Sequence, residues 1–277
     1  MRFTTIRLAD GPKAARVEGE ELVLLPFADV GEMLASGPKW KDSGSADGER
    51  LPLAGADLAP LVLNPEKIFC VGLNYRDHAA EGGLDLPTHP TLFAKFARAL
   101  IGPGEDLVLP DPAISSLIDW EVELGVVIGS QLRHASESEA LAAVAGYTIV
   151  NDISVRDWQL RTSQYLAGKT FEASTPVGPF LVTPDEVDPT SGLAIRLTLD
   201  GQTMQESSTD QLAIGVAKTL SYISEIITLI PGDLIATGTP AGVGHVRTPP
   251  RYLVDGSVVE CTIEGLGTQT THCVSAA

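Results

Sequence analysis

The chain has 277 residues, enough for one large domain or for a large domain with a small appendage. Hydrophobic residues make up 44% and charged residues 20%, as is typical of a globular protein, and the net charge of −17 argues against a nucleic-acid partner, because phosphate binding needs clustered Lys and Arg. No apolar run reaches the roughly 18 residues of a membrane-spanning helix, and no basic amphipathic segment indicates a membrane surface. Three scattered cysteines and an N-terminus without an apolar signal region predict a reduced, cytoplasmic setting.

Residues 1–62 are predicted to form a small N-terminal α/β domain, or cap. Residues 4–8, 15–17 and 21–25 have the composition of short strands, and residues 29–35 that of a helical turn. The polar segment 37–50 is rich in Gly and Ser and is predicted to be a long loop. This region contains no convincing catalytic motif.

Residues 68–73 are a candidate buried strand, which leads into His78 and Glu81. Residues three apart share one face of a helix, and a carboxylate beside an imidazole is the arrangement of a general base. The alternative, a surface histidine with a chance acidic neighbour, is the commoner case for one such pair. Residues 82–87 contain two glycines and are predicted to let the His78 segment move as a lid, unless they are an ordinary surface loop.

Residues 91–96 form the next candidate strand, on which Phe93 and Lys95 share a face. A lysine in this position can meet an anionic substrate, but a solvated lysine is the commoner case.

The stretch 119–128, DWEVELGVVI, is predicted to be one β-strand, with Asp119, Glu121 and Glu123 projecting from the same face. Three acids on one face of a core strand repel one another and are costly to bury, unless a bound cation offsets both effects. Hard divalent ions such as Mg²⁺ and Ca²⁺ take carboxylate oxygens. The alternative is a solvated acidic face on an edge strand, and this stretch alone does not decide between the two.

The next helix and strand are predicted around residues 140–150. Ser136 and Glu139 have the spacing of a capping box before the apolar run 140–145, so a helix is expected to end near Gly146. A strand over residues 147–150 then delivers Asn151 and Asp152 at its carboxyl end, where functional side chains often lie.

Ser154 and Asp157 repeat the capping spacing, which predicts a helix through residue 166. Arg156 and Gln159 share a face of that helix and can hold a carboxylate near a metal at Asp152. The alternative is a surface helix of mixed polarity. Lys169 follows in the segment LAGKTF.

The last third of the chain is predicted to alternate strands with one long helix. Strands are expected at residues 180–182, 193–199 and 234–236, and a helix at 211–229. The loop 237–244, TGTPAGVG, is expected to expose backbone N–H groups and hydroxyls to an anion. It lacks the lysine of a P-loop, and no GxGxxG opens a helix, so nucleotide binding is not predicted.

Four segments of this chain, GLNYRDHAAE, DWEVELGVVIG, NDISVRDWQ and PGDLIATGTPAGVG, together resemble the fumarylacetoacetate hydrolase family in order and spacing. The resemblance covers roughly residues 65–265. It implies a mainly β (α+β) fold, a mixed β-roll with few helices over residues 63–277, that follows the small N-terminal cap. It also implies a homodimer with a divalent metal in the roll. The chain departs from the family's usual pattern at Ser257 and at the ending GLGTQTT.

The resemblance also implies roles for individual residues. The metal ligands are Glu121, Glu123 and Asp152, with Asp119 beside them, and the ion is Mg²⁺ or Mn²⁺, with Ca²⁺ also compatible. His78 and Glu81 form the catalytic pair and act with Lys169. The substrate, a small 2-oxo or enol acid, contacts Arg156, Gln159 and Thr239 as well as Lys169.

The leading functional hypothesis is a metal-dependent hydrolase that cleaves a carbon–carbon bond of an acylpyruvate through a metal-stabilised pyruvate enolate. The same enolate chemistry serves isomerisation of a 2-hydroxydienedioate and decarboxylation of an oxaloacetate-type 2-oxo diacid. Hydrolysis needs a pair of residues that activates water, whereas decarboxylation needs only the chelated metal and a proton donor. Because His78 and Glu81 form such a pair, hydrolysis is preferred. A hypothesis of another class, a non-catalytic metal-binding protein on the same fold, requires the loss of a ligand or of the pair, and neither is lost.

Overall fold

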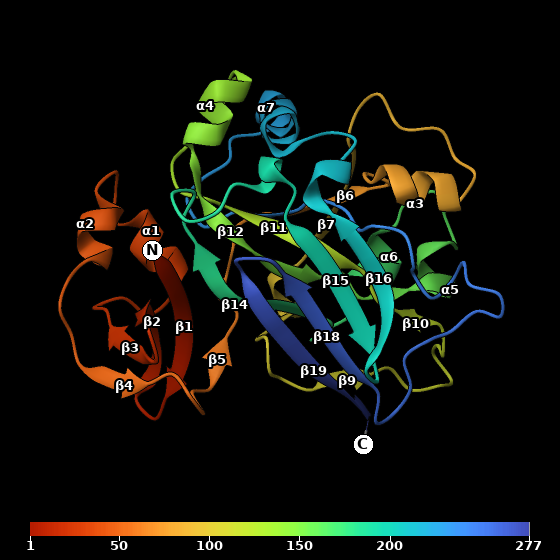
Figure 1. Cartoon of the computed structure of the whole chain (residues 1–277), viewed down its shortest axis with the longest axis horizontal. Coiled ribbons are helices and arrows are strands. Elements are labelled where there is room, and N and C mark those ends of the chain that lie inside the picture. The colour runs from red at the N-terminus through yellow and green to blue at the C-terminus, as the bar shows by residue number, and fades with distance from the viewer. Residues whose placement is uncertain (277) are drawn as a thin grey trace.

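The computed structural model describes residues 1–276 and consists mainly of β-strands with short helices. The largest sheet has twelve strands in the order β4-β3-β2-β1-β14-β12-β11-β17-β6-β7, with β5 beside β1 and β8 beside β14 (Figure 1). It is a mixed sheet, since β17 runs parallel to β6 whereas β11 is antiparallel to β12. Its strands are β1 (Arg2–Leu8), β2 (Gly11–Glu18), β3 (Glu21–Leu24), β4 (Arg50–Pro52), β5 (Leu58–Ala59), β6 (Ile68–Gly72), β7 (Thr91–Lys95), β8 (Leu100–Ile101), β11 (Val122–Ile128), β12 (Val144–Asn151), β14 (Thr175–Val182) and β17 (Leu234–Ala236).

A second sheet of five strands packs on one face of the first. Its order is β16-β15-β18-β19-β9, and a small ladder joins β10 to β13. The side chains of Val122 and Leu124 meet those of Ile195 and Leu197 in the apolar core between the two sheets. The predicted mainly β fold with few helices is confirmed. The remaining strands are β9 (Leu107–Leu109), β10 (Ile118–Asp119), β13 (Ser154–Val155), β15 (Ala194–Leu199), β16 (Gln202–Ser208), β18 (Val258–Ile263) and β19 (Gly267–Ser275).

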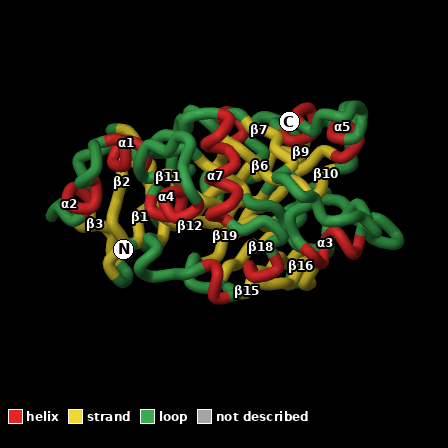
Figure 2. Tube along the Cα trace, turned by 90° about the horizontal axis from the view of Figure 1, so that it is seen from above, coloured by secondary structure: helices red, strands yellow, loops and turns green. Residues whose placement is uncertain are grey.

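The helices are short and lie around the sheets. Figure 2, a view from above, shows α7 and α4 in front of the strands, where the two helices pack against each other. The capping box predicted at Ser136 and Glu139 is present at the start of α4. The helices are α1 (Val30–Ala35), α2 (Trp40–Gly44), α3 (Arg76–Glu81), α4 (Glu137–Ala142), α5 (Arg156–Gln159), α6 (Leu166–Lys169) and α7 (Val216–Ile226).

The N-terminal strands extend the large sheet, because β1 pairs with β14 and Phe3 lies opposite Leu181. The boundary at residue 62 stays a prediction. The segment 37–50 is not the continuous loop that we expected, since α2 forms within it. The reason is Trp40, which is buried and packs edge-on against Phe3 with ring centroids 6.0 Å apart.

The stretch 119–128 is two strands, not the single strand predicted. β10 ends at Asp119 and β11 begins at Val122. Side chains take the place of a strand partner at the break: the backbone N–H of Glu121 donates to Oδ1 of Asn151 (3.1 Å), and that of Val122 donates to Oε1 of Gln205 (3.0 Å).

Two predicted helices are shorter in the structure. The helix expected over residues 154–166 is only α5, because Ser154 and Val155 pair with β10 and the Ser154 hydroxyl donates to the carbonyl of Asp152 rather than capping a helix. The helix expected over residues 211–229 begins at Val216, since the chain before it forms a 3₁₀ turn and a bridge to Tyr75.

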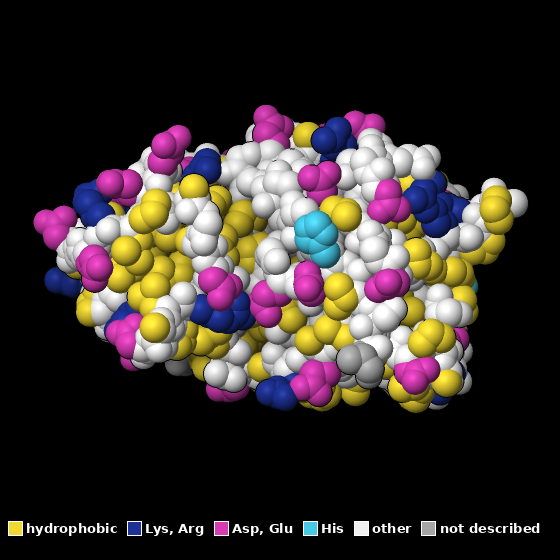
Figure 3. All heavy atoms as spheres, turned by 90° about the horizontal axis from the view of Figure 1, so that it is seen from below, with side chains coloured by type: hydrophobic (Ala, Val, Ile, Leu, Met, Phe, Trp, Pro, Cys, Tyr) yellow, Lys and Arg dark blue, Asp and Glu magenta, His cyan; other side chains and the backbone are white. Residues whose placement is uncertain are grey.

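Figure 3 shows one face of the molecule, over which acidic side chains are widely spread.

Candidate active site

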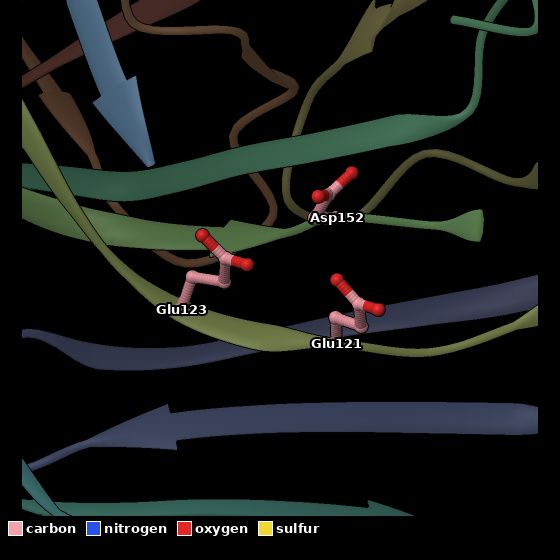
Figure 4. A group of neighbouring side chains, drawn as sticks. All are labelled: Glu121, Glu123 and Asp152. Carbon is pink, nitrogen blue, oxygen red and sulfur yellow. The ribbon is translucent and has the colours of Figure 1, made fainter. Parts of the chain in front are cut away.

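Three carboxylates meet on one face of the large sheet, where β11 begins and β12 ends. Glu121, Glu123 and Asp152 are all buried, and one oxygen from each lies within 4.8 Å of the others (Figure 4). β11 lies between β12 and β17, so the alternative of a solvated acidic face on an edge strand is wrong. The pleat explains the arrangement, because Glu123 lies opposite Val150 and residue 152 projects from the same face as residue 150.

Backbone hydrogen bonds hold the segments of the site together and orient one of its carboxylates. The backbone N–H of Asp152 donates to the carbonyl of Glu121 (2.8 Å), which holds the end of β12 beside the start of β11. The backbone N–H of Gly238 donates to Oε2 of Glu123 (2.7 Å). The fold itself therefore sets the spacing of the two segments and the direction of the Glu123 carboxylate.

Two buried lysines bind opposite oxygens of Asp152. Nζ of Lys169 lies 2.8 Å from Oδ2 and 2.6 Å from Oε2 of Glu121, while Nζ of Lys95 lies 2.8 Å from Oδ1. Of the two alternatives for Lys95, the solvated lysine is wrong, because its side chain is buried and also donates to the Thr175 hydroxyl (2.8 Å). One sequence signal pointed to Lys95 as a residue of this site: it follows Phe93 by two residues and so shares its face of β7.

Arg156 is also part of this network. Its guanidinium contacts Oδ2 of Asp119 (2.8 Å), Oε1 of Glu121 (2.7 Å) and Oε1 of Gln159 (2.8 Å). Asp119 further accepts hydrogen bonds from the backbone N–H groups of Gly244 and His245. Asp119 thus lies beside the three carboxylates and orients Arg156.

The carboxyl groups of Glu121 and Glu123 have pKa values shifted in opposite directions. Burial acts to raise the pKa of Glu121, but the charges of Lys169 and Arg156 outweigh it and lower that pKa to about 2. The pKa of Glu123 is raised well above its ordinary value, first by burial and then by Asp152 and Glu121. Among the residues that the structure describes, no Lys or Arg forms an ion pair with Glu123.

The donor set fits a divalent cation. Lys95, Arg156 and Lys169 supply three positive charges to the four carboxylates of Asp119, Glu121, Glu123 and Asp152, which leaves one negative charge without a partner. Glu123 carries that unpaired charge, and burying it is costly without a cation. An all-oxygen set suits Mg²⁺, Mn²⁺ or Ca²⁺.

His78 and Glu81 lie on α3 as the spacing predicted. Nδ1 of His78 is 3.2 Å from Oε2 of Glu81, and Oε1 of Glu81 accepts a hydrogen bond from the backbone N–H of Gly242 (3.0 Å). Both side chains are partly exposed. A carboxylate on Nδ1 favours the tautomer whose Nε2 is free to accept a proton.

One cavity of about 240 Å³ brings these groups together. His78, Glu121, Glu123 and Lys169 line it, along with the predicted substrate residues Arg156, Gln159 and Thr239. No sequence motif pointed to His245, which also lines the cavity and whose Nδ1 lies 2.9 Å from the Tyr252 hydroxyl. Apolar side chains form the rest of the wall, among them Val71, Leu84, Phe93, Leu160, Tyr165, Val243 and Val246.

The loop 237–244 binds anions, but they are the protein's own carboxylates. Its N–H groups donate to Glu123, Glu81 and Asp119. The Thr239 hydroxyl donates to the carbonyl of Val122 (2.9 Å) and accepts from Nε2 of Gln205 (2.8 Å), so its hydrogen is already in use.

Comparisons with known proteins place this site in a family. Residues 67–274 match the family described as "Fumarylacetoacetate (FAA) hydrolase C-terminal". The chain is 43% identical over 251 residues to a "Fumarylacetoacetate hydrolase domain-containing protein 2 homolog" of Dictyostelium discoideum, a match that covers 84% of this chain and 81% of that protein. It is 45% identical over 212 residues to "Oxaloacetate tautomerase FAHD2A, mitochondrial" of Bos taurus, covering 76% of this chain and 67% of that protein.

A solved structure shares the whole fold. The 2-hydroxyhepta-2,4-diene-1,7-dioate isomerase of Mycobacterium marinum superposes with a TM-score of 0.81 at 32% identity, covering 100% of this chain and 99% of that one. No helix within residues 1–276 combines the length and the apolar character needed to cross a membrane. Relatives include proteins named mitochondrial, and the cytoplasmic location of this chain stays a prediction.

Proposed function

The chain belongs to the fumarylacetoacetate hydrolase family, and we propose that it is a divalent-metal enzyme that interconverts the enol and keto forms of a small 2-oxo acid, with oxaloacetate as the first substrate to test. The observation that carries this proposal is the cavity in which Glu121, Glu123 and Lys169 face His78. Relatives that are 45% identical and named oxaloacetate tautomerases support the choice of substrate.

Glu121, Glu123 and Asp152 would hold the metal. When bound, a divalent ion supplies Lewis-acid stabilisation of the negative charge that an enolate carries. Arg156 is paired with Asp119 and Glu121, so it would orient Glu121 as a metal ligand and would not contact the substrate.

The residues of this chain supply binding and proton transfer. Lys169, held by Glu121 and Asp152, keeps its positive charge because those carboxylates raise its pKa although burial acts to lower it. It would stabilise the substrate carboxylate or the enolate oxygen. Oε1 of Gln159 accepts from Arg156, whereas its amide nitrogen has no partner within residues 1–276 and would donate to the substrate.

His78 would move the proton. In the direction from enol to keto form, its imidazolium would give a proton to the carbon next to the 2-oxo group while the enol hydroxyl loses its proton to water. Water would then return a proton to the imidazole, so that no net proton is gained or lost. Glu81 would hold the ring and stabilise its charged form. The apolar side of the cavity would exclude bulk water during this transfer.

A second candidate is hydrolysis of an acylpyruvate, in which His78 takes a proton from water. The cavity favours it because Leu84, Leu160 and Val246, which come from three separate segments, are exposed large apolar residues that line its wall. Such a wall suits a substrate with an apolar acyl group. Isomerisation of a 2-hydroxydienedioate and decarboxylation of oxaloacetate use the same enolate and belong in the same test.

The experiment is a substrate panel with the Mg²⁺- or Mn²⁺-loaded protein. The enol of oxaloacetate is followed by ultraviolet absorbance, and products from acylpyruvates, 2-hydroxydienedioates and keto-oxaloacetate are identified by chromatography. Spontaneous tautomerisation is subtracted, and Glu123→Gln serves as the matched control. A parent protein that leaves the enol lifetime at the level of this variant would contradict the tautomerase proposal.

The homodimer stays a proposal that sedimentation equilibrium tests.

A further inference from the structure

Helix α3, which carries His78 and Glu81, is held to the protein mainly by polar contacts. Of its six residues only Ala79 is buried. It lies on the opposite side of the molecule from the N-terminal strands, and the chain after it loops outward (Figure 1). Little apolar packing therefore fixes the position of the catalytic pair.

Asp77 supplies a contact that crosses to a distant strand. Its Oδ2 accepts a hydrogen bond from the hydroxyl of Ser207 on β16 (2.5 Å), a residue 130 positions later in the chain. Its Oδ1 accepts from the backbone N–H of His78 (2.7 Å) and faces that of Ala241 (3.4 Å). One carboxylate thus joins α3, β16 and the loop 237–244.

The geometry explains why this contact matters for the pair. Asp77 and Glu81 are four residues apart and share a face of α3, and Glu81 also contacts the loop 237–244 through Gly242. His78 lies between these two attachments and its ring is oriented by one of them. A hydrogen bond to a charged group is stronger than one between neutral groups, so the Asp77–Ser207 contact constrains the start of α3, as does the hydrogen bond from the Arg76 guanidinium to the carbonyl of Leu212 (3.0 Å).

We infer that Asp77 and Ser207 are positioning residues for the His78–Glu81 pair, an inference that rests on the proposed function of that pair. Neither residue lines the cavity, so neither touches substrate. Without the Ser207 hydroxyl, α3 would keep the Glu81 attachment and the hydrogen bond from the Arg76 guanidinium to the carbonyl of Leu212 (3.0 Å), but would lose the contact that joins its start to β16. The His78 ring would then occupy its working position for a smaller fraction of the time.

Ser207→Ala tests the inference, with Ser207→Thr as the conservative variant and Ser208→Ala as the matched control. Ser208 lies on the same strand, and its side chain makes no capping hydrogen bond. Two measurements are made on the metal-loaded protein: hydrogen–deuterium exchange of the backbone N–H groups of residues 76–82 and 241–242, and kcat and KM with the best substrate of the panel.

We expect Ser207→Ala to speed exchange in both segments and to lower kcat between about 5- and 100-fold, because small misplacements of catalytic groups cost up to about 100-fold. KM and oxalate affinity should stay at parental values, since the carboxylates and Lys169 are untouched, and the thermal midpoint should fall by no more than a few degrees, because one partly buried hydrogen bond is lost. Ser207→Thr should restore both readouts, and Ser208→Ala should change neither. If Ser207→Ala does not fold, Asp77→Asn, which keeps the shape of the side chain but loses its charge, carries the same test with a smaller effect.

Unchanged exchange in Ser207→Ala overturns the inference, as does an unchanged kcat in the presence of faster exchange. A lower kcat that is shared with Ser208→Ala, or that is accompanied by a higher KM and a weaker oxalate affinity, shows a merely structural role and overturns it too. If the parent acts on no substrate of the panel, the proposed function fails, whereas the exchange measurement still decides whether Ser207 anchors α3.

Discussion

Lys95 places its ammonium nitrogen 2.8 Å from Oδ1 of Asp152 in the interior of the protein, on the opposite side of that carboxylate from Lys169. Both side chains of this ion pair are fully buried. The pair neutralises one of the four carboxylates and prevents Asp152 from adding a second unpaired charge next to Glu123.

Replacing Lys95 by Met should therefore destabilise the metal-free protein. Removing one partner of a buried ion pair leaves an uncompensated charge and costs about 3–5 kcal/mol of unfolding free energy. Urea denaturation in the presence of a chelator measures the loss. Arg98→Met, which removes an exposed pair with Glu172, is the control and should change stability little. Equal effects of the two variants would show that Lys95 carries no special electrostatic role.

Glu123→Gln should separate metal binding from folding. The substitution removes the carboxylate that has no cation partner and keeps its shape, so the metal-free protein should be as stable as the parent or more stable. Affinity for Mg²⁺ or Mn²⁺ should fall at least about 100-fold, because a charged ligand is lost. Calorimetric titration measures the affinity, with Glu172→Gln on the surface as control. Parental affinity in Glu123→Gln would remove Glu123 from the ligand set.

The stability of the metal-free protein should depend on pH through Glu123. Its folded-state pKa lies well above the ordinary value of 4.5, so the folded protein binds more protons than the unfolded chain between 4.5 and that raised pKa. Stability should fall as pH rises through this window. Glu121 acts in the opposite sense: its pKa of about 2 contributes stability above 4.5 that is lost as pH falls towards 2.

Unfolding in urea at a series of pH values, with a chelator present, checks this dependence. In a plot of unfolding free energy against pH, Glu123→Gln should remove the fall in stability above pH 4.5. It should leave the loss of stability towards pH 2 unchanged. Saturating Mg²⁺ should have a similar effect in the parent, because a bound cation favours the ionised carboxylate. A parent whose stability rises through the upper window would contradict the charge assignment.

His78→Ala should abolish catalysis without affecting the metal. The loss of a general acid or base typically costs about 10²–10⁴-fold in rate, so both tautomerisation and any acylpyruvate hydrolysis should fall by that factor. Metal and oxalate affinities should stay parental, because His78 belongs to α3 and not to the carboxylate group. Any oxaloacetate decarboxylation should suffer much less, since it needs no activated water.

The chain provides a matched control in His134, which is exposed and lies 3.0 Å from Glu225. His134→Ala removes a similar His–Glu pair far from the cavity and should leave all rates unchanged. Stopped-flow absorbance gives the enol lifetime in both variants. Undiminished turnover in His78→Ala would show that His78 is a surface histidine with a chance acidic neighbour.

The local parts of the site can be predicted from the order of the residues alone. Alternation along a strand places Glu121 and Glu123 on one face, and the turn of a helix brings His78 to Glu81, because both relationships depend only on the regular geometry of neighbouring residues. The four motifs together also indicated the family and its β-fold, which the comparisons confirm.

The polar groups that meet across long sequence separations are known only from the packing of the folded chain. Lys95 is buried because Asp152, 57 residues later, pairs with it, and the strand breaks after Asp119 because side chains such as Gln205 satisfy the backbone there. Ser154 caps no helix because β10 pairs with its backbone. A buried polar group is stable only with a partner, and the identity of that partner depends on how distant segments pack, which residue spacing does not specify.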